Sequence, residues 1–190
     1  MTSARTILAA AIASGALLAA GHAAAQGYIG GAIGQGRINV DCDGVANCDK
    51  TGTGFKLGGG YRFHPNLAVE ANYFDFGKAR ASDEELSASL KGSGMGVGVA
   101  AIADFSPSVY GVARLGLART KARLGLAGFG STSDSSSNPY YGVAIGWKMS
   151  PNLGIELGFD ASKVKYKDAE LEINESASTR LFSVGVNFSF

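Results

Sequence analysis

Eight charged residues stand where an extended strand would turn them toward one side, and their types are suited to chemistry. Four cations balance four anions in this set, which comprises Lys56, Arg62, Glu70, Asp104, Arg114, Lys148, Glu156 and Asp160. Carboxylates close to one another or to a cation can transfer protons, because neighbouring charges shift their pKa values. A balanced set in a confined interior can instead pair, which avoids the penalty of burying a lone charge. We interpret the set as a paired interior charge network, with a catalytic or ion-conducting role as the alternative.

The sequence holds little else that could carry a reaction. His64 is the one histidine beyond residue 25, and it precedes Pro65 in a short turn, where a polar side chain is ordinary. No zinc-ligand spacing, phosphate-binding loop or G-x-G-x-x-G fingerprint occurs. We therefore expect neither enzymatic activity nor a metal or cofactor.

Two cysteines lie close together in an acidic stretch. In an exported protein, Cys42 and Cys48 most simply form one disulfide that constrains a loop. The neighbouring aspartates suggest a calcium loop as the alternative. Gly52, however, stands where an EF-hand requires its bidentate glutamate, so we favour the disulfide.

The first 25 residues have the organisation of a secretory signal peptide. Arg5 precedes an apolar core rich in Ala, Leu and Ile, and Ala23-Ala24-Ala25 offers a small-residue cleavage site. We expect cleavage between Ala25 and Gln26, which leaves residues 26–190 as the mature domain. A buried or membrane-anchoring helix is the alternative for this segment.

The composition favours strands over helices in the mature domain. Hydrophobic residues make up 46% of the sequence, but beyond residue 25 they never form the run of ~20 that a spanning helix needs. The 28 glycines would also destabilise a helix-rich domain. The formal net charge is only +1 and no basic patch stands out, so we expect no nucleic-acid partner.

Three proline triplets recur along the chain: His64-Pro65-Asn66, Ser106-Pro107-Ser108 and Ser150-Pro151-Asn152. Proline beside Asn or Ser is the chemistry of tight turns. Each triplet is flanked by segments of about ten residues in which apolar residues alternate with small or polar ones. The stretches between triplets are polar in the middle. The repeating unit is therefore strand, tight turn, strand and long loop, which is typical of outer-membrane barrels.

Apolar residues alternate with small or polar ones, with a period of two, in seven segments. The first strand, Gln26 to Gln35, is weaker, but an even-numbered barrel without open edges needs it. A soluble β-sandwich would show the same period. Segments of about ten residues, with aromatic residues at both ends, suit a tilted membrane crossing better. The sequence therefore predicts an all-β fold, an eight-stranded antiparallel up-and-down transmembrane β-barrel.

Such a barrel encloses a lumen barely wide enough for its own side chains. We expect the charge network to fill it, with inward glycines making room for the long cations. The polar stretches of about Gly77 to Lys91, Thr120 to Asn138 and Lys163 to Ser178 are expected to be loops that carry recognition. Their charge is mixed, without a cluster that points to an anionic ligand.

With these features in place, the sequence resembles the outer-membrane β-barrel family of OmpA-type and OmpX/Ail-type proteins. The stretch from Gly60 to Tyr73 resembles the second strand, turn and third strand of the OmpA-type barrel, and Tyr110 to Gly116 resembles its fifth strand. The C-terminal residues, including Phe188 and Phe190, are similar to the signal that the barrel-assembly machinery reads.

The resemblance also implies a place for Glu70, because OmpA-type barrels carry a glutamate of an ion-pair gate there. Glu156 stands where the family has the arginine partner, so that particular pair does not carry over. The sequence shows no counterpart of the periplasmic peptidoglycan-binding domain of full OmpA-type proteins, and we expect no cell-wall tether.

We expect the mature chain to lie in the outer membrane of a Gram-negative bacterium, with both termini in the periplasm. Its expected partners are outer-membrane lipid and lipopolysaccharide, the barrel-assembly machinery and a host or phage ligand at the loops. The expected function is structural and surface-interacting: membrane integrity, with adhesion or recognition through the loops. A narrow porin-like channel for ions or small solutes is the alternative, and an outer-membrane enzyme is a third hypothesis that we do not favour.

Overall fold

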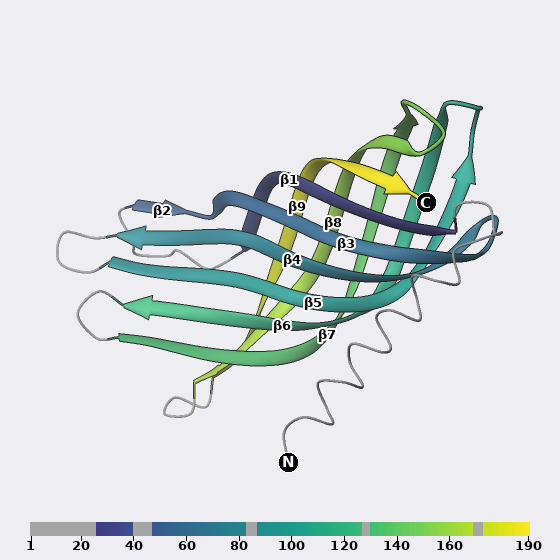
Figure 1. Ribbon diagram of the computed structural model, residues 1–190. Helices are drawn as coiled ribbons and strands as arrows, with labels where there is room; N and C mark the ends of the chain where they lie inside the picture. Colours follow the sequence, from purple (N-terminus) through teal and green to yellow (C-terminus); the bar gives the residue numbers. More distant parts are fainter. Residues whose placement is uncertain (1–25, 40–46, 83–86, 127–129, 169–172) are drawn as a thin grey trace, which may run out of the picture.

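The computed structural model describes residues 26–39, 47–82, 87–126, 130–168 and 173–190, which form nine β-strands (Figure 1). These strands are β1 (Gly27–Asn39), β2 (Asn47–Asp49), β3 (Thr51–His64), β4 (Leu67–Ser82), β5 (Ser87–Asp104), β6 (Val109–Leu126), β7 (Gly130–Lys148), β8 (Leu153–Asp168) and β9 (Ile173–Ser189). The part of the chain described contains no helix with the length and apolarity to cross a membrane.

Eight long strands form one closed antiparallel sheet. Their order is β4, β3, β1, β9, β8, β7, β6, β5, and pairing of β5 with β4 closes the ring. The short β2 adds three residues of pairing to the far end of β4. The predicted all-β fold, an eight-stranded antiparallel up-and-down barrel, is therefore confirmed.

The three proline triplets make tight turns at one end of the barrel, where they join β3 to β4, β5 to β6 and β7 to β8. In two of them a serine stabilises the reversal. The hydroxyl oxygen of Ser106 accepts a hydrogen bond from the Val109 backbone N–H (3.0 Å), and that of Ser150 accepts one from Leu153 (3.1 Å). Proline cannot extend the ladder and serine satisfies the freed backbone group, so the chain turns at these triplets.

The first and last strands meet at this same end, as Figure 1 shows for the C-terminus. The Phe190 backbone N–H donates to the Gly27 carbonyl oxygen (2.9 Å), and the Gly27 N–H donates to the Phe190 carbonyl oxygen (3.2 Å). The first strand is longer than expected, because β1 continues to Asn39 rather than ending at Gln35. We call this end the turn end and the opposite end the hairpin end.

Large apolar side chains cover the outside of the barrel, with exposed fractions between 37% and 69%. Phe63, Phe105 and Trp147 stand near the turn end, and Tyr141 stands near the other rim of this apolar belt. A continuous apolar surface of this kind is unfavourable in water and suits contact with lipid chains.

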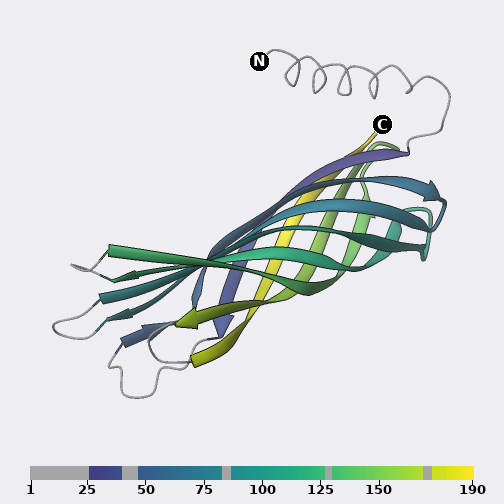
Figure 2. The ribbon, with the colours of Figure 1, turned by 90° about the horizontal axis from the view of Figure 1, so that it is seen from below.

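The hairpin end corrects one sequence-based expectation. The stretches 77–91, 120–138 and 163–178 were expected to be loops, but most of their residues continue the strands of the β4–β5, β6–β7 and β8–β9 hairpins. The strands of these hairpins extend to the end of the barrel opposite the tight turns (Figure 2). The apolar alternation stops where the lipid contact would stop, whereas backbone pairing does not depend on lipid and continues.

One β-bulge interrupts the long β4–β5 hairpin between Asp75 and Lys78. Gly77 there has a φ of 79°, which favours glycine because a side chain is rarely accommodated in that backbone conformation. The Asp75 carboxylate supports the bulge, since it accepts a hydrogen bond from the Gly77 N–H (2.9 Å) and pairs with Lys91 (2.7 Å).

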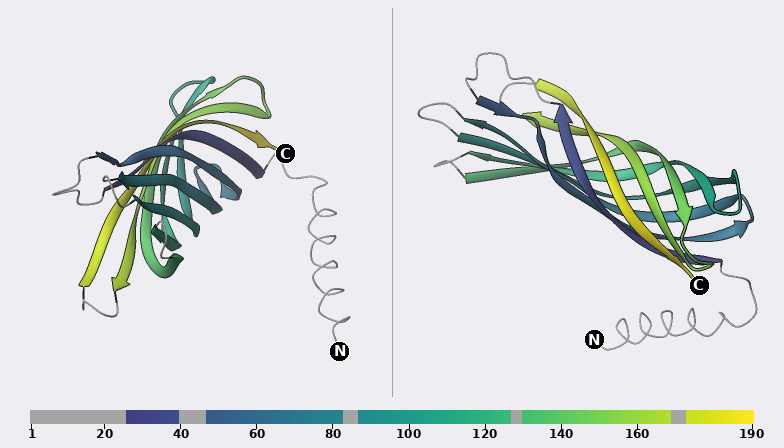
Figure 3. Two further views of the ribbon diagram at one scale, coloured as in Figure 1. Left: turned by 90° about the vertical axis from the view of Figure 1, so that its left-hand side faces the viewer. Right: turned by 90° about the horizontal axis from the view of Figure 1, so that it is seen from above.

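The lumen is filled in three layers. An apolar cluster near the hairpin end comprises Ile38, Phe74, Phe76, Ala79, Ala118, Tyr140, Ala177 and Leu181. A second apolar cluster toward the turn end comprises Ala68, Ala100, Ile102, Tyr110 and Val112. Charged side chains lie between the two apolar clusters. The sequence predicted only this charged layer. The left view of Figure 3 looks along the barrel from its hairpin end.

Three lumen tyrosines have described side chains, and each lies directly across from a glycine on the neighbouring strand. The pairs are Tyr28 with Gly60, Tyr110 with Gly146, and Tyr140 with Gly116. A Cβ added to any of these glycines would overlap the tyrosine ring. The rings therefore fill the space that the glycines leave.

We predict that Gly146→Ala destabilises the barrel by about 1–3 kcal/mol, because the added methyl group must displace the buried Tyr110 ring. The free energy of unfolding in urea, measured on protein folded into lipid vesicles, tests this. Gly158→Ala is the matched control, because a Cβ there meets its nearest atom, the Ser183 hydroxyl oxygen, at 3.4 Å. Equal losses in the two variants would contradict the role of the tyrosine–glycine pairs.

Candidate functional site

Arg114 is the centre of the charged layer, and it bridges two carboxylates from opposite parts of the wall. It projects inward from β6, and its Nε lies 3.0 Å from Glu70 Oε2 on β4. Its Nη2 lies 3.0 Å from Glu156 Oε2 on β8. The exposed fractions of the Arg114 and Glu70 side chains are 6% and 3%. The triad thus ties three strands together across the lumen.

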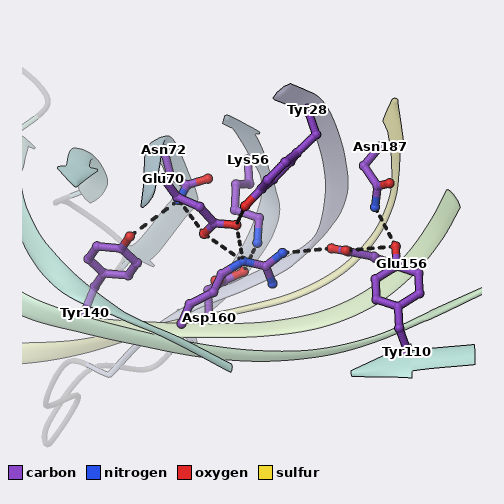
Figure 4. A network of polar contacts seen from close by, with 10 residues as sticks. Tyr28, Lys56, Glu70, Asn72, Tyr110, Tyr140, Glu156, Asp160 and Asn187 are labelled. Atoms are coloured by element: carbon purple, nitrogen blue, oxygen red, sulfur yellow. Dashed lines mark hydrogen bonds and ion pairs between the residues drawn. The ribbon is translucent and has the colours of Figure 1, made fainter. Parts of the chain in front are cut away.

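Hydroxyl and amide groups add hydrogen bonds around both carboxylates (Figure 4). The Tyr28 hydroxyl donates a hydrogen bond to Glu70 Oε1 (2.6 Å), and the Tyr110 hydroxyl donates one to Glu156 Oε1 (3.1 Å). The Asn187 amide donates to the Tyr110 oxygen (2.7 Å). These bonds matter because charge-assisted hydrogen bonds offset much of the cost of burying ionised groups.

A second buried pair lies on the hairpin side of the triad. Lys56 Nζ on β3 donates to Asp160 Oδ2 on β8 at 2.6 Å, and the two side chains are 11% and 2% exposed. Asn72 links this region to the apolar layer, because its amide donates to Glu70 Oε2 and to the Tyr140 hydroxyl, both at 3.4 Å. The polar network therefore continues up to the ring that closes the lumen.

The remaining predicted charges lie toward the turn end. Lys148 Nζ pairs with Asp104 Oδ1 at 2.7 Å, and the two side chains are 36% and 61% exposed. Arg62 makes no ion pair with any side chain that the structure describes, and its guanidinium lies 5.7 Å from the centroid of the Tyr28 ring. Of the eight residues of the predicted network, the structure brings seven into ion pairs and leaves Arg62 to a cation–π contact.

Sequence reasoning missed the tyrosines and asparagines of the network. In the alternation of their strands, Tyr28 and Tyr110 fall on the same face as the inward glycines and charges. That position was the signal that could have placed them in the lumen. It was overlooked because aromatic residues were assigned to the outer surface. The structure shows that a barrel this narrow also needs inward rings to fill its lumen.

Small cavities remain beside the triad. One of ≈ 50 Å³ is lined by Lys56, Glu70, Asn72, Arg114 and Glu156 among others, and one of ≈ 10 Å³ lies between Arg62, Tyr110 and Arg114. Buried polar atoms without a partner in the described part of the chain include Arg114 Nη1 and Asp160 Oδ1. The larger space has room for a few water molecules and the smaller for no more than one, which suits such atoms.

The other predicted sites lie outside the lumen. His64 is exposed in the first tight turn, and its Nδ1 accepts a hydrogen bond from the Asn66 N–H (3.3 Å). No group of three His, Cys, Asp or Glu side chains within the described ranges is arranged to hold a metal ion. Phe188 and Phe190 face outward at the turn end, with exposed fractions of 48% and 58%.

The cysteine region is described only in part. Cys48 lies in β2, whereas Cys42 is outside the described residues, so the predicted disulfide stays a prediction. Asp49 next to Cys48 bonds locally: the backbone N–H of Thr51 (3.0 Å) and its hydroxyl (2.8 Å) donate to the carboxylate and hold its pKa below the ordinary value. The predicted signal peptide, including Ala25, also lies outside the described residues, and Gln26 is the first residue described.

The closed sheet, the apolar outer face and the filled lumen define a small transmembrane β-barrel. The chain matches the family described as outer membrane protein beta-barrel domain over residues 6–190, and it belongs to that family. It is thus an integral protein of the Gram-negative outer membrane, with lipid as its surroundings. No curated protein matches the chain at a significant level.

Several solved structures share the fold. Neisserial surface protein A is similar with a TM-score of 0.62 and 14% identity, over 86% of this chain and 97% of the other. Ail of Yersinia pestis is similar with a TM-score of 0.54 and 21% identity, over 87% and 99% of the two chains. OprG of Pseudomonas aeruginosa has a TM-score of 0.55 and 13% identity, over 90% and 98%.

We predict that Arg114→Met lowers the free energy of unfolding by about 3–5 kcal/mol, because it leaves the buried Glu70 and the partly buried Glu156 without their cation. Lys148→Met is the control, and it should cost less than about 1 kcal/mol because its ion pair is exposed. Urea unfolding in lipid vesicles measures both. The triple variant Glu70→Gln, Arg114→Met, Glu156→Gln should recover part of the loss, and a failure to do so would contradict the pairing argument.

Proposed function

We propose that this protein is a closed barrel that contributes to outer-membrane integrity and presents its hairpin end for recognition at the cell surface. One observation carries the proposal: the apolar cluster that fills the lumen at the hairpin end. Phe74 and Phe76 lie there with nearly parallel rings, 5.8 Å between centroids, and Phe74 packs on Tyr140 at 5.2 Å. An ion that crossed the barrel would have to displace these buried rings.

The backbone supports the same interpretation. Gly36 on β1 lies so close to the Phe76 backbone on β4 that a Cβ at residue 36 would overlap the Phe76 carbonyl oxygen. β1 and β4, which only β3 separates in the sheet, therefore approach one another closely at the hairpin end. Below this constriction, Arg114, Glu70 and Glu156 occupy the lumen and bind one another. These side chains are bound to one another inside the lumen, where a substrate has little access, so we do not propose an enzyme.

The hairpins are the remaining surface for a partner. They extend from the apolar belt on a closed, rigid scaffold, which is where recognition usually resides. One structure of the similar protein Ail was determined in complex with the heparin analogue sucrose octasulfate, at a TM-score of 0.53 and 22% identity to this chain. A barrel of this fold can therefore bind a ligand, and we propose that this protein does so at its hairpin end.

The proposed orientation puts the turn end and both termini in the periplasm. Phe188 and Phe190 would then present the terminal assembly signal on the side from which barrels are inserted. The hairpin end, with β2 and the predicted Cys42–Cys48 disulfide, would face the outside. We further propose that the signal peptide is cleaved between Ala25 and Gln26, which leaves the N-terminus of the mature chain at the turn end.

We predict that the purified protein shows no steady conductance in planar lipid bilayers. The triple variant Glu70→Gln, Arg114→Gln, Glu156→Gln should also stay closed, because the apolar cluster above the triad is intact. Phe74→Ala combined with Phe76→Ala should produce measurable openings. Reproducible wild-type conductance would support the narrow channel instead, and conductance of the triple variant alone would identify the ion pairs as the closing element.

We predict that a cysteine introduced by Ser135→Cys on exposed β7 reacts on intact cells with a maleimide that does not cross membranes. Ser106→Cys in the second tight turn should react only after the outer membrane is opened. The wild-type protein serves as the control for its own cysteines. The reverse pattern of labelling would overturn the proposed orientation.

A further inference from the structure

Gln26, the first residue that the structure describes, is held through both of its carbonyl groups. Its backbone carbonyl oxygen accepts a hydrogen bond from the Arg62 N–H (2.7 Å). Its side-chain carbonyl oxygen, Oε1, accepts one from the Tyr61 hydroxyl. The pairing of β1 with β3 starts only at Gly27, so these two bonds fix Gln26 to β3 just before β1 begins.

The Tyr61 hydroxyl polarises the side-chain amide of Gln26. Tyr61 stands on the outer face at the turn end of the apolar belt, with an exposed fraction of 52%. Its ring suits contact with lipid at this level, and its hydroxyl needs a polar partner, which Gln26 Oε1 provides. A hydrogen bond in surroundings of low dielectric is stronger than in water, so the amide carbon Cδ becomes more electrophilic.

Signal-peptide cleavage would give the same residue a nucleophile. When the chain is cut between Ala25 and Gln26, as proposed above, the α-nitrogen of Gln26 becomes a free amine. An α-amine is uncharged in part of the molecules near neutral pH, and the uncharged form can attack a carbonyl carbon. Amine and amide belong to one residue, so the attack closes a five-membered lactam ring without a second molecule.

We propose that the mature chain modifies its own N-terminus by converting Gln26 to pyroglutamate, with the Tyr61 hydroxyl as the catalytic group. The α-nitrogen forms a bond to Cδ, and the bond from Cδ to Nε2 breaks. Nε2 leaves as ammonia with the proton that the α-nitrogen releases, so no electron transfer and no co-reactant is needed. Negative charge develops on Oε1 during the attack, and the Tyr61 hydroxyl, which already donates to that oxygen, stabilises it.

The product suits the place where the barrel closes. Gly27 exchanges two backbone hydrogen bonds with Phe190, so Gln26 stands at the seam between β1 and β9, close to the point marked C in Figure 1. A lactam carries no charge, whereas a free ammonium would have to stay solvated or ion-paired at the edge of the apolar belt. The lactam also removes the free amine that aminopeptidases require, which protects the first strand of the barrel.

Pyroglutamate formation rests on the proposed cleavage between Ala25 and Gln26, and one measurement separates the two. After reduction, the intact mass of the protein purified from outer membranes should correspond to residues 26–190 less one molecule of ammonia. The same residues with the ammonia retained would overturn the modification and leave the cleavage site standing. A chain that starts at another residue would overturn the cleavage site and the modification together.

The rate of ammonia loss tests the role of Tyr61. A folded barrel that carries a protease site immediately before Gln26 is cleaved in detergent to start the reaction, which is followed by intact mass. The folded wild type should cyclise about tenfold faster than the same chain unfolded in guanidinium chloride, because unfolding removes the oxyanion donor. Tyr61→Phe should abolish this advantage. Tyr141→Phe, the matched control on another exposed tyrosine of the outer face, should keep it.

Equal rates for the folded wild type and folded Tyr61→Phe would overturn the catalytic role of the hydroxyl. The chemistry of the attack has its own readout, because the wild-type rate should rise with pH as the α-amine loses its proton and then level off. Gln26→Glu should keep an unmodified N-terminus over the same period, since a carboxylate is a poor electrophile. A rate that does not depend on pH, or cyclisation of Gln26→Glu at the wild-type rate, would overturn the proposed attack.

Discussion

The structure depends on one constraint. In a hydrocarbon environment, every backbone N–H and C=O needs a hydrogen-bond partner within the protein. Pairing of β4 with β5 closes the sheet and removes its edges, so the long strands meet that need. Closure with eight strands then fixes a narrow lumen. The tyrosine–glycine pairs, the Arg114 triad and the two apolar layers fill most of that space and pair most of the charges within it.

The two faces of the wall solve opposite electrostatic problems. Inside, Arg114 and Lys56 are surrounded by carboxylates, since a buried charge is tolerated only with its counter-charge and hydrogen bonds. Outside, the hairpin rim carries cations such as Arg37, Arg180 and Arg119, which face water and lipid headgroups. The same strand alternation lets one wall carry paired charges inside and solvated charges outside.

The fold was predictable from local signals because each one has a direct physical cause. Proline triplets mark turns, and alternation with a period of two marks a wall with two different faces. The hairpins were predicted less well, since polar strands beyond the lipid belt lose the apolar half of that alternation. The partners within the charge network could not be predicted. Glu70, Arg114 and Glu156 come from β4, β6 and β8, and their contact depends on curvature and register across the lumen.

The amino-acid sequence by itself determined the class of the protein, its strand count and the inward position of its charges, because these follow from turn chemistry and side-chain alternation. Only the tertiary structure decided which charges pair, that Phe74 and Phe76 close the lumen, and that Arg37 stands opposite Arg180. These features arise from residues far apart in the chain that closure of the barrel brings together. Closure depends on how strands pair across the whole sheet, which no local stretch of sequence specifies.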